Sequence, residues 1–449
     1  MRKHQICLKG FKGIIAERQS IMVKKNIIHL VHAAVFLAVL GLVLMKVSDV
    51  FERKDSQNKY NEFFEDPEAY DVIFLGSSHV HCGILPMELY KDYGIAAYNC
   101  GNSGSSIKET YYTFKNILDY NTPKLIVIDT YFLGPNESNF VYVSNGHKAL
   151  DAFPITKTKI DTISSLYTDT DEQIEMLIPF VRYHSRWNEL RSQDFSREQT
   201  TIKGEILEYA VANGVKTPEI IDTADYDDSW TLGKEYLEKL IGLAKSKGIE
   251  VLITTIPYPA NVEEQLAQNY AYKLSQEYDV NYLNLLEISD LINYNTDMGD
   301  ATSHLNRSGA LKVTSYLGDY IVNHYDIADR RYDEAYKTWE QNYESYVNIN
   351  IQALDYQTNI NTYLMLLTNK ELECSVNLND SVTEDKYPLI YQLINNIDGM
   401  ELCGEGIWIN IADKSRLPDT TRQYDADVHV VVYRKGTTTI VSEKSFSMK

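Results

Sequence analysis

The pattern of apolar and polar positions breaks first near the N-terminus. Residues 27–45 are almost entirely apolar and carry no formal charge. A helix rises about 1.5 Å per residue, so about 20 residues cross a hydrocarbon core of about 30 Å. The pattern therefore predicts a transmembrane helix over 27–47. A cleaved signal peptide and a buried core helix are the alternatives. The run is longer than a typical secretory apolar region, and no small-x-small cleavage site follows it.

The charges on the two sides of this helix differ in sign. The positive-inside rule places the basic side in the cytoplasm. We therefore expect residues 1–26 to be cytoplasmic and the rest of the chain to be extracytoplasmic. The basic residues before the helix are Arg2, Lys3, Lys9, Lys12, Arg18, Lys24 and Lys25, and the acidic residues after it are Asp49, Glu52, Asp55, Glu62, Glu65, Asp66 and Glu68.

Short apolar runs then alternate with segments of helical spacing. This rhythm predicts α/β structure, with a parallel sheet covered on both faces. Active sites in such sheets lie at the carboxyl ends of the strands. The expected strands are 71–75, 96–99, 124–129, 250–256 and 281–285, and the expected helices are 85–93, 105–120, 229–247, 262–278 and 306–325.

The pattern changes again after the last of these helices. Scattered aromatics predict a helical connector, and two-residue alternation then predicts a small β-rich domain. The expected parts are a linker (48–70), an α/β domain (71–328) with an irregular helical insertion (135–228), a connector (329–361) and the β-rich domain (362–449).

Composition excludes some partners and cofactors. The net charge of −20 argues against nucleic acid, because binding phosphates needs a positive field. The chain has no glycine-rich phosphate loop, dinucleotide fingerprint or metal-ligand spacing, so we expect no cofactor and no metal. Cys82 with Cys100, and Cys374 with Cys403, are candidate bridges, and unpaired buried thiols are an equal alternative.

Two separate segments carry the residues of a serine nucleophile and its base. In FLGSSH (74–79) a buried strand ends at a glycine, and Ser78 follows where the chain turns into a helix. A serine hydroxyl needs a base at neutral pH. The segment DATSHLN (300–306) supplies His304 on another strand-following loop, with Asp300 upstream to fix the tautomer of the imidazole.

These segments resemble the conserved blocks of SGNH/GDSL hydrolases. FLGSSH resembles the first block, NCGNSGSS (99–106) the second and DATSHLNRSGALKV (300–313) the last. The resemblance spans about residues 70–325 and implies a flavodoxin-like α/β/α domain. It implies Ser78 as nucleophile, with the backbone N–H groups of Ser78 and Gly104 in the oxyanion hole and Gly101 as the alternative donor. The membrane-anchored arrangement resembles cell-envelope branches that move or remove acyl groups on glycans and teichoic acids.

The chain departs from the family pattern at two places. No asparagine stands in the third block, which falls near DTYFL (129–133), and Asn136 is the nearest substitute for this oxyanion donor. The triad acid of the family stands three residues before the histidine. Asp300 stands four before it, and Asp297 is a weaker candidate.

Four further side chains are candidates for binding substrate. His79 follows the nucleophile, and Tyr258 follows a predicted strand at its carboxyl end. Arg182 and Arg186 could bind an anionic group through two parallel hydrogen bonds. Each also has a structural interpretation, as helix packing, a rigid turn or a salt-bridged helix surface.

The sequence thus favours an extracytoplasmic serine esterase or O-acyltransferase that acts on a small acyl group, acetyl by expectation, of a cell-envelope polysaccharide or teichoic-acid-like polymer. The alternative is a catalytically silent accessory or glycan-binding protein that partners a membrane acyltransferase. A nucleotide-binding flavodoxin-like domain is less favoured, because GSSHVHCG (76–83) lacks the run of glycines and hydroxyls that cradles phosphate, and because the expected extracytoplasmic location argues against a cytosolic cofactor.

Overall fold

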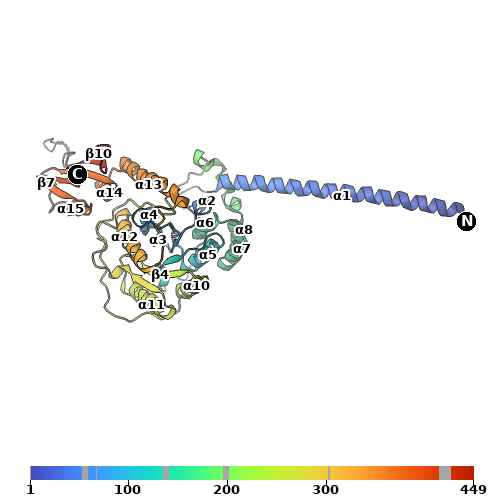
Figure 1. Cartoon of the computed structure of the whole chain (residues 1–449), viewed down its shortest axis with the longest axis horizontal. Helices are drawn as coiled ribbons and strands as arrows, with labels where there is room; N and C mark the ends of the chain where they lie inside the picture. The colour runs from blue at the N-terminus through green and yellow to red at the C-terminus, as the bar shows by residue number, and fades with distance from the viewer. Residues whose placement is uncertain are drawn as a thin grey trace. The chain divides into compact units, whose positions relative to one another are not determined.

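The computed structural model describes residues 2–52, 59–66, 68–134, 141–195, 202–301, 304–413 and 426–448 (Figure 1). The chain forms two compact units. One unit comprises residues 1–54 with 170–198, and the other comprises residues 55–169 with 199–449.

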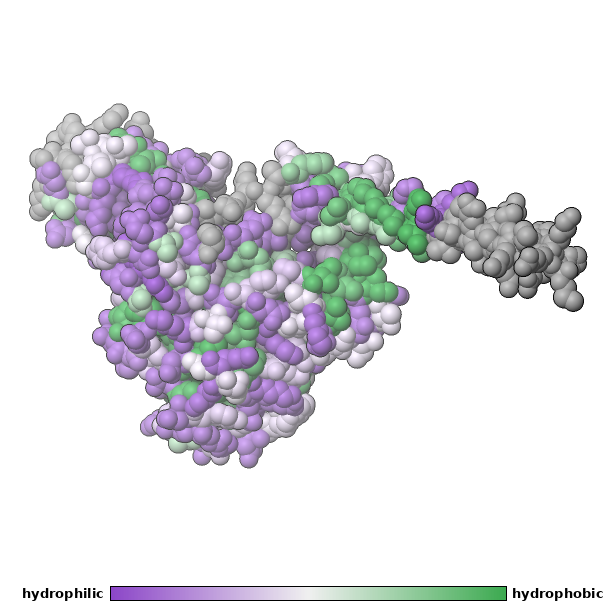
Figure 2. Space-filling model, turned by 45° about the vertical axis from the view of Figure 1, so that its right-hand side comes forward, coloured by the Kyte–Doolittle hydropathy of each residue, from purple (hydrophilic) through white to green (hydrophobic). Residues whose placement is uncertain are grey.

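The first unit is built around the long helix α1 (Arg2–Phe51). Its part Lys24–Phe51 is long and apolar enough to cross a membrane, and none of that apolar stretch is buried within the protein. Figure 2 shows hydrophobic surface on this apolar part of α1. The remaining elements of this unit are α8 (Thr170–Leu177), α9 (Pro179–Tyr183) and the 3₁₀ helices η2 (His184–Asn188) and η3 (Ser192–Phe195).

The second unit contains a five-stranded parallel sheet, as the sequence predicted. Its strand order is β2-β1-β3-β4-β5, and every neighbouring pair runs parallel. The order reverses between β1 and β3, and ligands bind in open α/β sheets at such a point. The strands are β1 (Val72–Leu75), β2 (Ala97–Asn99), β3 (Leu125–Asp129), β4 (Glu250–Thr255) and β5 (Asn281–Asn284).

Helices cover this sheet because its strands are apolar on both faces, as buried parallel strands are. On one face, Val72, Phe74 and Val127 share a core cluster with residues of α4 (Pro86–Tyr93) and α12 (Arg307–His324). The other helices of the α/β rhythm are α5 (Ile107–Ile117), α10 (Leu232–Ser246) and α11 (Val262–Tyr278).

Two segments outside the regular strand–helix alternation also pack into the α/β domain, one before β1 and one between β3 and β4. The expected linker contains α2 (Tyr60–Glu65), whose Tyr60 and Phe63 are buried, and the Tyr60 hydroxyl donates to the Cys100 carbonyl at 2.7 Å. The packed domain therefore includes residues before Asp71. The irregular region contributes α6 (Val143–Leu150) and α7 (Lys157–Leu166) to this unit.

The C-terminal part is an antiparallel sheet with helices against it, and this matches the predicted β-rich region. Its strand order is β10-β9-β6-β8-β7. Cys374 is buried and Cys403 exposed, and the four described cysteine side chains are free thiols. The elements are α13 (Lys337–Tyr356), α14 (Ile360–Leu366), β6 (Leu372–Leu378), α15 (Pro388–Asn395), β7 (Glu401–Gly404), β8 (Ile407–Ile409), β9 (Val428–Arg434) and β10 (Ile440–Phe446).

A buried ion pair joins three helices of the second unit. Arg307 of α12 donates from Nη2 to Glu88 Oε1 of α4 at 3.0 Å and to the Tyr346 hydroxyl of α13 at 3.1 Å. The Tyr346 hydroxyl in turn donates to Glu88 Oε1 at 3.0 Å. Because all three side chains are buried, each charge depends on the others for its hydrogen bonds.

We predict that Arg307→Met lowers the free energy of unfolding by about 3–5 kcal/mol, because Glu88 is left buried without its cation. Arg331→Met is the matched control. Its partner Asp329 is solvent-exposed, and such a pair contributes about 0–1 kcal/mol. Urea unfolding of both variants, followed by near-UV circular dichroism in detergent, measures the difference. Equal losses in the two variants would contradict the prediction.

Candidate active site

Ser78 lies at the end of β1, where the chain turns into the short helix α3 (Ser78–Gly83). The turn depends on Gly76, because a Cβ there would lie 2.6 Å from Val80 Cγ2 and 3.0 Å from Asp129 Cβ. The Ser77 hydroxyl accepts from the His79 backbone N–H at 3.4 Å and caps α3. The local sequence thus holds Ser78 at the carboxyl edge of the sheet, beside the point where the strand order reverses.

Ser78, His304 and Asp300 form a hydrogen-bonded chain. His304 Nε2 lies 2.7 Å from Ser78 Oγ, across 226 residues of sequence. On the other side of the ring, His304 Nδ1 pairs with the Asp300 carboxylate. The His304 and Asp300 side chains are 29% and 42% exposed, so a ligand can reach these hydrogen-bonded side chains from solvent. The structure therefore brings together the three residues that the sequence put forward as catalytic.

The loop that carries His304 is closed by Asn306. The Asn306 amide N–H groups donate to the Thr296 carbonyl at 2.8 Å and the Met298 carbonyl at 3.2 Å. Its side-chain oxygen caps α12 by accepting from the Ser308 and Gly309 backbone N–H groups. Met298 and Leu305 form a β-bridge and lie in the core under the sheet. The segment between them is therefore held at both ends.

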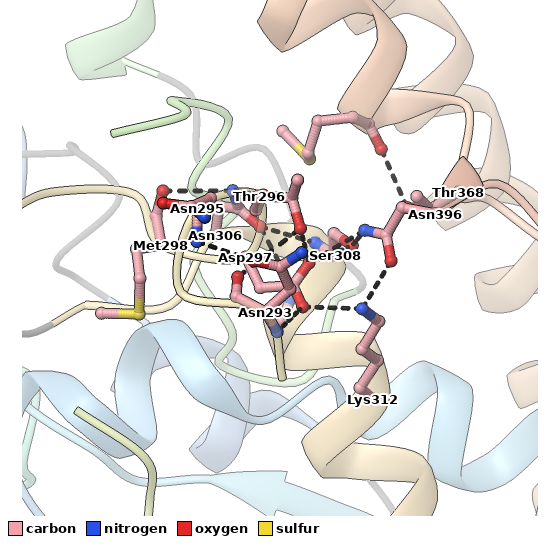
Figure 3. A network of polar contacts seen from close by, with 12 residues as sticks. Asn293, Asn295, Thr296, Asp297, Met298, Asn306, Ser308, Lys312, Thr368 and Asn396 are labelled. Atoms are coloured by element: carbon pink, nitrogen blue, oxygen red, sulfur yellow. Dashed lines mark hydrogen bonds and ion pairs between the residues drawn. The ribbon is translucent and has the colours of Figure 1, made fainter. Parts of the chain in front are cut away.

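Asp297 anchors the same loop from below (Figure 3). Its buried carboxylate accepts from Lys312 Nζ at 2.7 Å, Ser308 Oγ at 2.9 Å and Asn396 Nδ2 at 2.9 Å, as well as from the Asn293 backbone N–H at 2.8 Å. Asp300, and not Asp297, is therefore the carboxylate that pairs with the ring of His304, while Asp297 accepts hydrogen bonds from the four donors just named. Asn396 follows α15, so the C-terminal domain contacts the base of the histidine loop.

The candidate oxyanion donors differ in their surroundings. The Gly101 backbone N–H donates to the Asn99 side chain at 3.0 Å, so this alternative donor already has a partner. Gly104 adopts a φ of +70°, and its carbonyl accepts from Asn145 Nδ2 at 2.9 Å. The Asn102 N–H donates to the Gly76 carbonyl at 3.0 Å, which ties this loop to the nucleophile turn. Asn136 lies outside the described residues.

Asp129 stands where the family's third block would begin. Its carboxylate accepts from the backbone N–H groups of Ile256 at 3.1 Å and Tyr131 at 3.3 Å, and so joins the ends of β3 and β4. Burial raises the pKa of Asp129 to about 7, although these backbone N–H groups oppose the rise. Asp129 is thus a cap of the sheet edge beside Gly76.

His79 and Tyr258 lie in a buried aromatic group next to the histidine. The His79 ring stacks on Tyr131 with ring centroids 3.7 Å apart, and it contacts Tyr258 at 5.1 Å and His304 at 5.7 Å. Burial, helped by the neighbouring His304, lowers the pKa of His79 well below its ordinary value, so the ring is neutral at pH 7. Both side chains are covered in this structure, and they form a wall behind the base.

Arg182 and Arg186 belong to the first unit. Arg182 pairs with Glu175 at 3.3 Å, and Arg186 pairs with Asp194 at 2.9 Å. Both ion pairs are made within that unit, in agreement with the interpretation of these arginines as a salt-bridged helix surface.

An extended segment near the site was missed by sequence reasoning. The Ile206 N–H donates to the His81 carbonyl at 3.2 Å, and the Ala212 N–H donates to the Met298 carbonyl at 2.9 Å. This segment therefore links the helix after Ser78 to the histidine loop. The structure has neither a helix nor a strand over 205–212, and the path of such a segment depends on tertiary contacts that its apolar pattern does not report.

Within the described parts of the chain, no group of three or more histidine, cysteine, aspartate or glutamate side chains is arranged to hold a metal ion. The groups that the site brings together are the hydroxyl of Ser78, the imidazole of His304 and the carboxylate of Asp300.

Comparisons with known proteins identify no family. No family model and no curated protein matches the chain. Among solved structures, a candidate acylhydrolase from Bacteroides fragilis is similar over 60% of this chain and 99% of its own, at 12% identity and a TM-score of 0.30. A gut microbial diltiazem-metabolizing enzyme is similar over 56% of this chain and 47% of its own, at 14% identity and a TM-score of 0.19. At these identities and TM-scores, neither likeness supports a function for this chain.

We predict that replacing Asp297 by alanine destabilises the fold much more than replacing Asp300 by alanine. Asp297→Ala strands several buried donors and should lower the free energy of unfolding by about 2–4 kcal/mol. Asp300→Ala removes a half-exposed carboxylate and should change it by less than about 1 kcal/mol. Thermal unfolding followed by circular dichroism checks both values, and a larger loss for Asp300→Ala would contradict the assignment.

The raised pKa of Asp129 predicts a pH dependence of stability. Between pH 4 and 7 the folded protein holds a proton on Asp129 that the unfolded chain, with an ordinary pKa of 3.8, has released. The contribution of this residue to stability therefore falls as pH rises through that window. We expect wild type to lose stability relative to Asp129→Asn between pH 4 and 8 in urea unfolding. A difference that does not vary with pH would contradict this.

Proposed function

We propose that the chain is an extracytoplasmic serine esterase or O-acyltransferase that removes or transfers a small acyl group, such as acetyl, on a cell-envelope polysaccharide or teichoic-acid-like polymer. The observation that carries the proposal is the hydrogen-bonded chain Ser78–His304–Asp300 at the switch point of the sheet. The resemblance of its three sequence segments to SGNH/GDSL blocks supports the same class.

In this proposal Ser78 Oγ attacks the acyl carbonyl carbon while His304 Nε2 takes the serine proton. Asp300 accepts from Nδ1–H, which fixes the tautomer and stabilises the imidazolium. The tetrahedral intermediate then collapses, and His304 returns the proton to the departing sugar oxygen. Water or a second sugar hydroxyl, deprotonated by His304, attacks the acyl-enzyme and releases Ser78.

The oxyanion of the intermediate is held by the backbone N–H groups of Ser78 and Gly104 in this account. In other enzymes, removing one such oxyanion-hole donor lowers kcat by about 10²–10³-fold. The third-block asparagine is missing, and Asp129, where that block would begin, accepts hydrogen bonds from the backbone N–H groups of Ile256 and Tyr131. We therefore propose an oxyanion hole built from backbone N–H groups.

The cellular setting of the proposal comes from α1. A membrane-crossing α1 with its basic end in the cytoplasm would hold the serine site outside the cell membrane. For that setting we propose acyl esters of envelope polymers as the substrates and a membrane acyltransferase as the partner for a transfer reaction.

We predict that the full chain in detergent hydrolyses p-nitrophenyl acetate and that its serine reacts with a fluorophosphonate probe. Ser78→Ala and His304→Ala should reduce turnover to background, and Asp300→Ala should reduce it by about 10³–10⁴-fold, because the imidazole loses its fixed tautomer. Ser77→Ala is the matched control, since it removes the neighbouring hydroxyl, which only caps α3.

Probe labelling that survives in Ser78→Ala would overturn the assignment of the nucleophile. A wild-type chain that neither turns over ester nor labels would favour the accessory protein, with the fold kept and the chemistry lost.

A further inference from the structure

The first unit carries an unusual concentration of exposed apolar side chains after α1. We call residues 170–195, which contain α8, α9, η2 and η3, the juxtamembrane segment. Exposed apolar surface gathered in one place marks contact with a partner or a membrane. Its large apolar side chains that are more than a third exposed are Ile174, Ile178, Val181, Trp187 and Phe195.

The juxtamembrane segment is fixed to the end of α1 by specific contacts. The Phe180 ring packs edge-on against Phe51, with ring centroids 5.6 Å apart. Arg186 donates to the Phe51 carbonyl and, through Nη2, to Asp194 at 2.9 Å. Asp194 is buried, so the arginine charge is paired and costs less to place in an apolar surrounding.

An open apolar groove lies between α1 and the juxtamembrane segment. It has a volume of about 570 Å³, and Lys46 is the charged residue on its wall. Val39 stands six residues before the end of the apolar run at Met45, which places it about 9 Å inside that run. If α1 crosses a membrane over this run, the groove begins at the depth where lipid tails surround the helix. Its wall includes Val39, Leu42, Val43 and Val47 of α1, and Leu190 and Phe195 of the segment.

We propose that the juxtamembrane segment is inserted in the membrane surface and that the groove holds an acyl chain of a bilayer phospholipid. The groove is continuous with the lipid-facing surface of α1, and a lipid tail matches its apolar wall. Trp187 suits the boundary between hydrocarbon and headgroups, where tryptophan is enriched. Arg182 and Lys46 can extend their charged ends toward the headgroups along apolar stems.

This arrangement changes how the second unit is held. The chain leaves the first unit after residue 54, returns at residue 170 and leaves again after residue 198. A membrane-inserted segment therefore attaches the second unit to the membrane by three connections. A single tether after α1 would provide one. Three connections limit how far the second unit can lie from the membrane surface more than one connection would.

The test uses the full chain in vesicles of phosphatidylcholine whose acyl chains carry bromine, which quenches tryptophan fluorescence on contact. Trp187 and Trp230 are 71% and 68% exposed, and Trp230 lies in the second unit. We expect bromine to quench wild type and Trp230→Phe, and the quenched component to be lost in Trp187→Phe. Quenching that is kept in Trp187→Phe would overturn insertion of the segment.

Occupancy of the groove is tested by Phe195→Trp in the Trp187→Phe background. Bromines near the middle of the acyl chains should quench the introduced indole more strongly than bromines near the headgroups. If the indole emits at short wavelength without quenching, protein fills the groove, such as a second copy of the chain. If it emits at long wavelength without quenching, the groove is open to water. Either result overturns the lipid proposal.

Discussion

The hydrogen bond between His304 Nε2 and Ser78 Oγ is the contact on which the account of this protein depends. The two residues are 226 positions apart in the sequence. Their side chains meet because the turn after β1 and the loop after β5, which carries His304, lie at the same edge of one parallel sheet. A serine without this base is a poor nucleophile. The proposed chemistry therefore requires a fold that keeps the turn with Ser78 and the loop with His304 within hydrogen-bond distance of each other.

The two loops are held by different means. The nucleophile turn depends on close backbone approach, since Gly76 lies against Val80 and Asp129 where any side chain would collide. The histidine loop depends on polar contacts, in which Asn306 closes it and Asp297 ties it to Lys312 and Asn396 (Figure 3). Because Asn396 belongs to the C-terminal domain, that domain supports the loop of the proposed base as well as forming its own core.

The sequence predicted the α/β sheet well because its strands are short apolar runs bounded by glycine, proline or polar residues. It also indicated Ser78, His304 and Asp300, whose residue types and strand-following positions together suggest one chemistry. It did not predict β7 or α15, which are short and interrupt the alternation of the β-rich region. The contacts of Ala212 with Met298 and of Asn396 with Asp297 join residues that are far apart in the sequence. The local pattern of apolar and polar positions carries no information about such contacts.

The chemistry proposed for this site rests on the claim that Ser78 becomes acylated. The most direct measurement is peptide mass spectrometry of the full chain after brief reaction with p-nitrophenyl acetate and quenching in acid. We expect one acetyl ester, on Ser78, that is absent in Ser78→Ala and accumulates less in His304→Ala. Acetyl found on another residue, or rapid turnover with Ser78 replaced, would contradict the claim.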